Sequence, residues 1–186
     1  MAKEASHEQL ERLICLVCQQ LVAAKVERVG DAVQSSPPQM NGEVEQAVAI
    51  LGFTGMQMSG SVAICAGVDL IHALHPRHET GEELLEEHLL DWLRELVNLV
   101  TGKFKRELIR CGIRLSMTPP TVLTGSVWRI ASLAQEGSTR WFRFETSVSP
   151  FYLALGCEID EKLQLPDLRP SALKAQARPE MRLMLL

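Results

Sequence analysis

The chain has 186 residues, a formal net charge of −4 and an apolar fraction of 46%, values typical of one folded domain with its own core. Its acidic balance and scattered lysines and arginines offer no basic field for phosphate backbones, so we expect no nucleic-acid partner. No apolar run approaches the roughly 20 residues that cross a bilayer, and the charged amino terminus is unlike a signal peptide. We therefore expect a cytoplasmic protein without a membrane segment.

The first predicted element is an amphipathic helix. Apolar side chains recur at steps of three and four residues over residues 8–29, which is the pattern of a helix with one buried face. The next segment, residues 31–43, contains paired prolines, serines and an Asn-Gly step that break any regular period. We predict a surface loop there.

Two adjacent strands are predicted next. Residues 45–67 are rich in small and β-branched side chains, and the glycines near Gly55 and Gly60 suit the turn of a hairpin. A short helix over residues 68–74 should then end before Pro76, because proline disfavours a helical residue ahead of it.

The longest predicted element is a helix of about thirty residues. Thr80 and Glu83 have the spacing of a capping box at its start, and Gly112 is a plausible terminator at its end. Placed on a helical wheel, its apolar residues form one stripe that should face the core. They are Leu85, Leu89, Leu93, Leu96, Val97, Val100, Phe104 and Leu108.

Three extended stretches follow the long helix, at residues 115–125, 129–135 and 139–158, the last with a break at Ser149 and Pro150. Helix, strands, long helix and further strands favour a two-layer α/β (α+β) fold with a mostly antiparallel sheet and the amino-terminal helix packed with the long helix. We assign residues 1–162 to this domain. Residues 163–186 form a carboxyl-terminal extension that is flexible or docks through its apolar end.

The outward side of the long helix carries a second pattern. Asp91, Glu95, Asn98, Gly102 and Lys105 cluster opposite the apolar stripe, and Glu95 and Asn98 are one turn apart. Gly102 costs a helix about 1 kcal/mol relative to alanine, so a small residue there indicates close approach by another surface. An acid, an amide and a glycine on one edge suit a docking site, although solvated polar residues often share this spacing.

Residues 91–125 resemble the CheX/CheC family of chemotaxis phosphatases, whose mark is Glu-x-x-Asn on a long helix, here Glu95 and Asn98. The basic residues after the motif, the glycine that closes the helix and the Pro-Thr-Val start of the next strand are also similar. With the paired strands upstream, the likeness covers roughly residues 45–125.

A CheC-like member would carry a second Glu-x-x-Asn near its start. Here the residue three positions after Glu8 is Glu11 and not an asparagine, so the chain has a single motif, which is similar to the CheX branch. The chain departs from the family pattern at Thr118 and Pro119, at the bulky Arg94 beside the motif, and in its long tail. These departures bear on the identity of the partner more than on the chemistry.

The resemblance implies dephosphorylation of an aspartyl-phosphorylated, CheY-like response regulator. Asn98 would hold the attacking water and Glu95 would pair with a lysine of the regulator, with Asp91, Gly102 and Lys105 in the docking surface. The regulator would bring the Mg²⁺ ion, so we expect no cofactor in this chain. Family members typically pair as homodimers by joining their sheets.

Other readings stay open. The same helix could serve a non-catalytic receiver-binding module or signalling adaptor, or be buried by oligomerisation in a structural subunit.

Cys15 and Cys18 form a C-x-x-C without a second pair, which favours core thiols over a metal site. Histidines recur every third residue from residue 72 to residue 78, but Pro76 interrupts the helix that would align them, and we expect no metal site.

Overall fold

The computed structural model describes residues 2–38, 46–78, 83–125 and 139–161, with Leu163 and Leu165. Its elements are α1 (Ala2–Ala23), β1 (Val33–Ser35), β2 (Gln46–Gly55), β3 (Met58–Gly67), α2 (Val68–Leu74), α3 (Glu86–Arg110), β4 (Leu115–Met117), β5 (Thr121–Gly125), β6 (Thr139–Phe144) and β7 (Phe151–Ile159). The strands of this described part form one sheet in the order β1-β6-β7-β3-β2-β4, with β5 also paired to β2.

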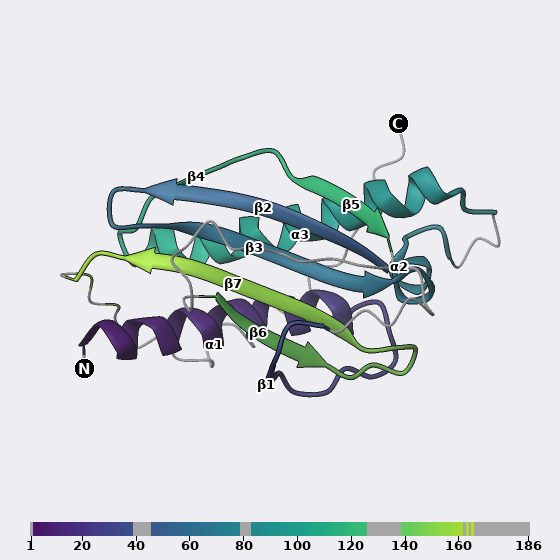
Figure 1. Cartoon of the computed structure of the whole chain (residues 1–186), viewed down its shortest axis with the longest axis horizontal. Helices are drawn as coiled ribbons and strands as arrows, with labels where there is room; N and C mark the ends of the chain where they lie inside the picture. The colour runs from purple at the N-terminus through teal and green to yellow at the C-terminus, as the bar shows by residue number, and fades with distance from the viewer. Residues whose placement is uncertain are drawn as a thin grey trace.

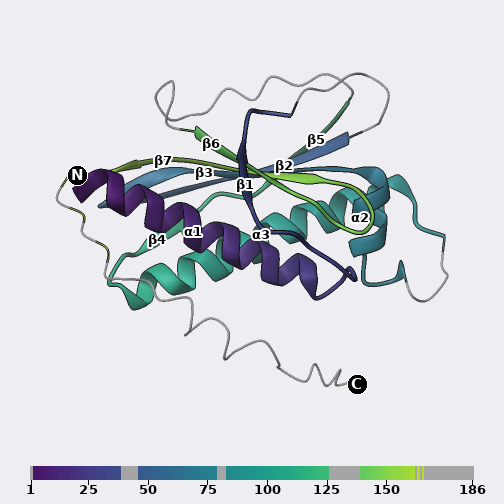
Figure 2. The same ribbon diagram turned by 90° about the horizontal axis from the view of Figure 1, so that it is seen from below.

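The fold has two layers, as the sequence predicts. Every pair of the named strands is antiparallel, because consecutive strands are joined by hairpins or by returns across the sheet. α1 and α3 lie side by side on one face of the sheet (Figure 1 and Figure 2). The expected antiparallel sheet, long helix and packed amino-terminal helix are therefore confirmed.

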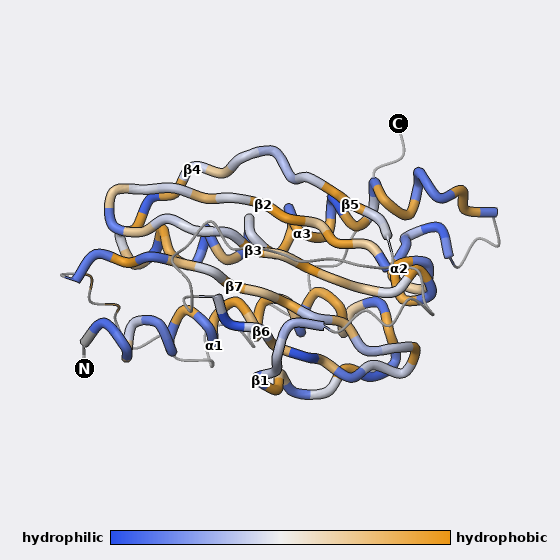
Figure 3. The backbone as a smooth tube through the Cα atoms, viewed as in Figure 1, coloured by the Kyte–Doolittle hydropathy of each residue, from blue (hydrophilic) through white to orange (hydrophobic). Residues whose placement is uncertain are grey.

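The core lies between the helices and the sheet. Successive side chains of a strand point to opposite faces, and the helix-facing positions of β2 are Ala47, Ala49, Leu51 and Phe53. The opposite face of the sheet has a smaller buried cluster that includes Val48, Cys65 and Trp141. In Figure 3 the central strands are largely hydrophobic, whereas the two long helices alternate between hydrophilic and hydrophobic turns. None of the described helices combines the length and apolar character needed to span a membrane.

The β2–β3 hairpin is confirmed, and its turn lies between Gly55 and Gly60 as predicted. The strands pair from Gln46↔Gly67 to Thr54↔Ser59, so the turn follows Gly55, while Gly60 lies inside β3. A Cβ atom at Gly60 would overlap the carbonyl oxygen of Gly156 on β7. The glycine at position 60 thus allows close strand approach and does not form the turn.

The amino-terminal region also differs from its prediction. α1 begins at Ala2 and ends at Ala23, earlier at both ends than the predicted range 8–29. The segment predicted as a loop contains β1, which pairs with β6 from Val33↔Arg143 to Ser35↔Trp141. A three-residue edge strand depends on backbone pairing with its neighbour, so its side-chain pattern gave no signal.

The long helix starts later than its prediction. Residues 83–85 are not helical, and α3 begins at Glu86 after the extended residue Leu85; Thr80 lies outside the described residues. Leu85 is 53% exposed and is not part of the apolar stripe. The imidazole of His88 accepts a hydrogen bond from the Leu85 N–H at 3.3 Å, so the start is capped by a side chain in the first turn.

The carboxyl end of α3 is where the sequence places it. Gly112 adopts a positive φ of 82°, which glycine tolerates without a steric penalty. The Gly112 N–H donates to the Ile109 carbonyl at 2.9 Å, and the Ile113 N–H donates to the Leu108 carbonyl at 3.0 Å. These two bonds form a Schellman motif, which ends the helix sharply and directs the chain into β4.

Thr118 has a structural role in the gap between β4 and β5, which also contains Pro119. Residues 118–120 separate the two strands, and both strands pair with β2. At the gap the Thr118 hydroxyl oxygen accepts the Gly52 N–H at 3.0 Å, and the Thr118 N–H donates to the Gly52 carbonyl at 2.9 Å. The threonine therefore satisfies the backbone of β2 where the ladder is interrupted.

The end of the predicted domain is only partly described. Leu163 is 3% exposed, and its carbonyl accepts the hydroxyl of Ser6 on α1 at 3.1 Å. The predicted boundary after residue 162 and the extension 163–186 stay predictions. The extended stretch predicted at residues 129–135 also lies outside the described residues.

Candidate functional site

The outward side of α3 carries the five residues that the sequence predicts as a site. We call them the motif edge: Asp91, Glu95, Asn98, Gly102 and Lys105. Asp91 and Glu95 are exposed and the other three are partly exposed. The opposite side of the helix is packed, because Leu93, Val97 and Phe104 are each 0% exposed. The motif edge is thus part of a helix whose opposite face packs against the core.

Glu95 and Asn98 project together from adjacent turns. At about 100° per residue, positions three apart differ by roughly 60° around the helix axis, so both side chains leave α3 in similar directions. Among the described residues, no ion pair is formed by Glu95 and no hydrogen bond by the Asn98 carboxamide. Their polar groups are therefore available to another molecule.

The charged neighbours of this pair differ in what they contact. Arg94, the bulky residue beside the motif, forms an ion pair with Asp91 one turn earlier. Lys103 donates to the side-chain oxygen of Gln20 on α1 at 2.8 Å, and burial followed by repulsion from Arg106 lowers its pKa. Lys103 therefore joins the two long helices, whereas the partly exposed Lys105 remains on the motif edge.

Gly102 has no packing partner that would require a glycine. A Cβ atom built at this position meets nothing within 4 Å, and the residue lies in the middle of α3 with an ordinary helical backbone. Alanine would favour the helix by about 1 kcal/mol. Folding therefore does not explain this glycine. Its effect is that no side chain projects from the motif edge at the position one turn after Asn98.

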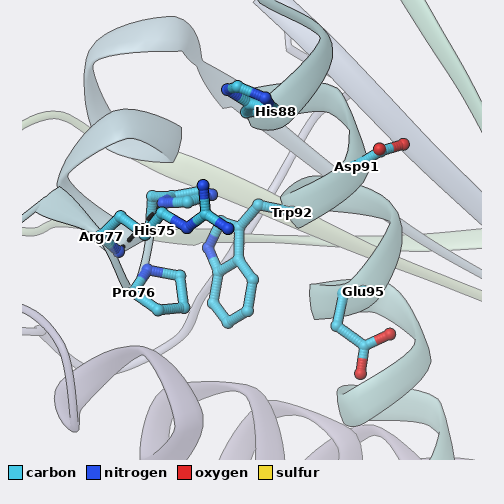
Figure 4. A pocket seen from close by; sticks show the side chains of 7 residues that line it. All are labelled: His75, Pro76, Arg77, His88, Asp91, Trp92 and Glu95. Atoms are coloured by element: carbon cyan, nitrogen blue, oxygen red, sulfur yellow. Dashed lines mark hydrogen bonds between the residues drawn. The ribbon is translucent and has the colours of Figure 1, made fainter. Parts of the chain in front are cut away.

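A pocket adjoins the amino-terminal end of the motif edge (Figure 4). It has a volume of about 360 Å³ and lies between the end of α2 and the first turns of α3. It is lined by His75, Pro76, Arg77, His88, Asp91, Trp92 and Glu95. Asp91 and Glu95 belong to both the pocket and the motif edge, so one bound molecule can contact both.

Trp92 forms one wall of this pocket. Its indole ring packs partly against the core and makes an edge contact with the His75 ring at 5.9 Å between centroids. Burial, followed by repulsion from Arg77, lowers the pKa of His75, so this imidazole is neutral near pH 7. The sequence pattern did not indicate this pocket, because its walls come from two separate segments of the chain. The available signal was an aromatic residue three positions before Glu95 on the same side of the helix.

The thiols do not form a site. Cys15 and Cys18 are buried in α1, and burial raises the pKa of Cys18 to about 12. Burial also raises the pKa of Cys65 to about 12. Thiols with such pKa values are almost wholly protonated at neutral pH and are poor nucleophiles and metal ligands. The interpretation as core cysteines is confirmed for this pair.

The histidines near α2 pair with each other. The Nδ1 atoms of His72 and His78 are 3.0 Å apart, and their rings meet edge to face. Within the described part of the chain, no group of three or more histidine, cysteine, aspartate or glutamate side chains is arranged to hold a metal ion. His75 lies instead on the pocket beside Trp92.

The chemistry that the motif edge can perform follows from its groups. A carboxamide is neutral and offers both a donor and an acceptor, so it can hold a water molecule in a fixed orientation. A carboxylate one turn away can bind a cation of a second molecule. Both groups are held by a rigid helix, which suits positioning more than proton transfer.

Comparison with known proteins gives one family and a consistent fold. The family described as chemotaxis phosphatase CheX matches residues 47–141, which include the whole motif edge. CheX from Vibrio vulnificus is similar in structure, with 21% identity and a TM-score of 0.66 over 81% of this chain and 97% of that chain. A CheC-like superfamily protein from Shewanella sp. PV-4 gives 20% identity and a TM-score of 0.65 over the same shares.

A third similar structure is a complex. It is the CheX–CheY–BeF₃–Mg²⁺ complex from Borrelia burgdorferi, with 16% identity and a TM-score of 0.58 over 81% of this chain and 96% of that chain. At these identities the structural matches show a common fold. A search of curated proteins gave no significant match.

Proposed function

The chain belongs to the family of the chemotaxis phosphatase CheX, and from that premise we propose that it hydrolyses the aspartyl phosphate of a CheY-like response regulator. Asn98 and Glu95 are the residues that carry the reaction. The observation that most supports this proposal is the open position of both side chains on one edge of α3, without partners among the described residues.

Asn98 positions the attacking water. An aspartyl phosphate is a reactive acyl phosphate, so its hydrolysis needs mainly a water molecule in line with the phosphorus atom and stabilisation of charge on the transferring group. The water oxygen forms the new bond to phosphorus, and the receiver aspartate leaves as a carboxylate. The carboxamide of Asn98 holds the water by accepting from it, and it carries no charge that would repel the phosphoryl oxygens.

Glu95 anchors the complex. Its exposed carboxylate forms an ion pair with a lysine of the receiver, and this contact fixes how deeply Asn98 enters the phosphorylated pocket. The receiver brings the phosphoaspartate, the lysine and the Mg²⁺ ion. Asp91, Gly102 and Lys105 complete the docking surface, with Gly102 allowing the receiver backbone to come close.

The choice of a CheY-like partner is supported by the fold. The similar CheX from Borrelia burgdorferi forms a complex with CheY, BeF₃ and Mg²⁺. The present chain has the same fold and offers an exposed acid and amide on its long helix. We therefore propose a receiver domain as the partner and the cytoplasm as the site of action.

The decisive experiment follows the decay of a phosphorylated CheY-like receiver with and without this protein. We expect the wild type to accelerate decay and Asn98→Ala to lose about a hundredfold or more of that acceleration, because a misplaced water costs this much. Asn98→Asp should also be inactive, since its charge repels the phosphoryl group. Gln9→Ala removes another partly exposed amide, on α1, and should remain fully active. Normal turnover by Asn98→Ala would refute the assignment.

A non-catalytic receiver-binding module remains the rival function. It predicts that the wild type binds the phosphorylated receiver without changing its decay rate, so parallel binding and decay measurements separate the two functions.

A purely structural subunit would require another chain to cover the motif edge, because the edge is open in the single chain. We also propose a homodimer, for which sedimentation of the purified chain is the test.

A further inference from the structure

The pocket beside the motif edge is rich in hydrogen-bond donors. The Nε1 atom of Trp92 is buried and has no hydrogen-bond partner, and an indole N–H can only donate. His75 Nδ1 accepts the backbone N–H of Arg77 at 3.1 Å, so the neutral ring carries its proton on Nε2. His88 Nδ1 likewise accepts the N–H of Leu85. Both imidazoles therefore present a donor nitrogen as their remaining polar atom.

The charges of the pocket are divided between its two ends. After burial, the groups that lower the pKa of His75 are Arg77, His88, His72 and Lys25. Of these, Arg77 and Lys25 are cations at neutral pH, so the α2 end of the pocket has a positive potential. At the other end the carboxylate of Asp91 is paired with Arg94, and Figure 4 shows it pointing away from the Trp92 indole. Glu95 supplies the negative charge of the outer rim.

We propose that this pocket binds a carboxylate side chain of the receiver, which accepts hydrogen bonds from Trp92 and His75 and faces the guanidinium of Arg77. A carboxylate is the common protein group that only accepts hydrogen bonds and carries a negative charge, so it matches both the donors and the potential. The volume of about 360 Å³ corresponds to roughly twelve waters at about 30 Å³ each, which is ample for one side chain. The inference rests on the proposed function, because it takes the receiver as the bound molecule.

The pocket would determine which receiver is accepted. Glu95 binds a cation, and the pocket beside it binds an anion, so the surface of α3 and α2 recognises an acid and a lysine at one fixed spacing. The indole N–H is already buried without an acceptor in the free chain, so a receiver that carries the acid gains a hydrogen bond that a receiver without the acid cannot form, and this gain discriminates between partners. Trp92, His75 and Arg77 are thus specificity-determining residues.

Binding of a BeF₃⁻/Mg²⁺-activated CheY-like receiver to the full chain tests this inference. We expect Trp92→Phe and Arg77→Gln each to raise Kd about tenfold, because a lost hydrogen bond to a charged group has an effect of this order. Arg114→Gln removes an exposed arginine beyond the opposite end of α3 and should leave Kd unchanged. Wild-type Kd values for both pocket variants would overturn the proposal. Arg77→Gln keeps the test valid if loss of the indole perturbs packing.

A second measurement identifies the bound group. In ¹⁵N-labelled protein, the indole N–H resonance that disappears in Trp92→Phe should shift when the activated receiver is added. Replacing receiver aspartates and glutamates singly by their amides should reveal one position whose effect on Kd vanishes in the Arg77→Gln background. Additive effects at every receiver acid would overturn the carboxylate assignment.

Failure of this inference is separate from failure of the proposed function. Hydrolysis is measured by receiver decay and depends on Asn98, whereas pocket occupancy is measured by Kd and by the Trp92 resonance. A receiver that binds through the pocket but decays at its own rate would refute the phosphatase assignment and retain the pocket. Accelerated decay together with unchanged Kd in both pocket variants would retain the phosphatase assignment and refute the pocket.

Discussion

The two sides of α3 are made of residues that obey different constraints. On the packed side, Leu93, Val97 and Phe104 are fully buried, and the Phe104 ring meets Phe53 of β2 at 6.2 Å between centroids. On the motif edge, no described contact holds the side chains of Glu95 or Asn98. Folding explains the residue types of the first side but not those of the second, so the second side is where function should be sought.

The largest effect expected from this comparison is on the packed side. Phe104→Ala should lower the free energy of unfolding by about 3–5 kcal/mol, because it leaves a cavity between α3 and β2. Urea denaturation followed by circular dichroism measures this change. The same truncation at Leu99, which is 40% exposed on the same helix, should change stability by no more than about 0.5 kcal/mol. Equal losses from the two variants would mean that the two sides are not distinct.

The next effect concerns the charge on the motif edge. Glu95→Gln keeps the shape of the side chain and removes its charge, so it should weaken receiver binding about 10-fold, the order expected for a lost charged hydrogen bond. The difference from wild type should shrink at high salt, because an ion pair is screened. Stability should stay unchanged, since Glu95 makes no ion pair among the described residues.

The control for this variant is Glu86→Gln, which makes the same charge change at an exposed position in the first turn of α3. It should leave receiver affinity unchanged and cost only a few tenths of a kcal/mol through the helix dipole. If both substitutions weaken binding equally, the receiver senses the general charge of the helix rather than one carboxylate.

The packed side of α3 could be predicted from sequence because its signal is local. Residues at steps of three and four from Leu89 to Leu108 are all buried as the helical period requires. The motif edge follows from the same wheel. The start of the helix could not be predicted this way, since Thr80 and Glu83 offer a capping box while the helix instead begins after Leu85, where His88 caps the backbone.

Features made by two distant segments were outside the reach of the sequence. β1 exists because its backbone pairs with β6, more than 100 residues later in the chain, and its own residues resemble a loop. The pocket has one wall from the end of α2 and another from α3, so neither segment alone indicates it. Trp92 packs partly against the core, but its unpartnered Nε1 is visible only in three dimensions.

The smallest effect, and the sharpest separation of folding from function, is expected at Gly102. Gly102→Ala should raise the free energy of unfolding by about 0.5–1 kcal/mol, since alanine favours the helix and its Cβ atom would meet nothing within 4 Å. The same methyl group stands on the motif edge one turn beyond Asn98, where the proposed receiver approaches closely. The variant should therefore be more stable and yet accelerate receiver decay less than the wild type. Alanine at Gly112, whose φ is 82°, is the matched control: it should lower stability by about 1 kcal/mol and leave the decay rate unchanged. Gain of stability with full activity at position 102 would show that this glycine is not part of the docking surface.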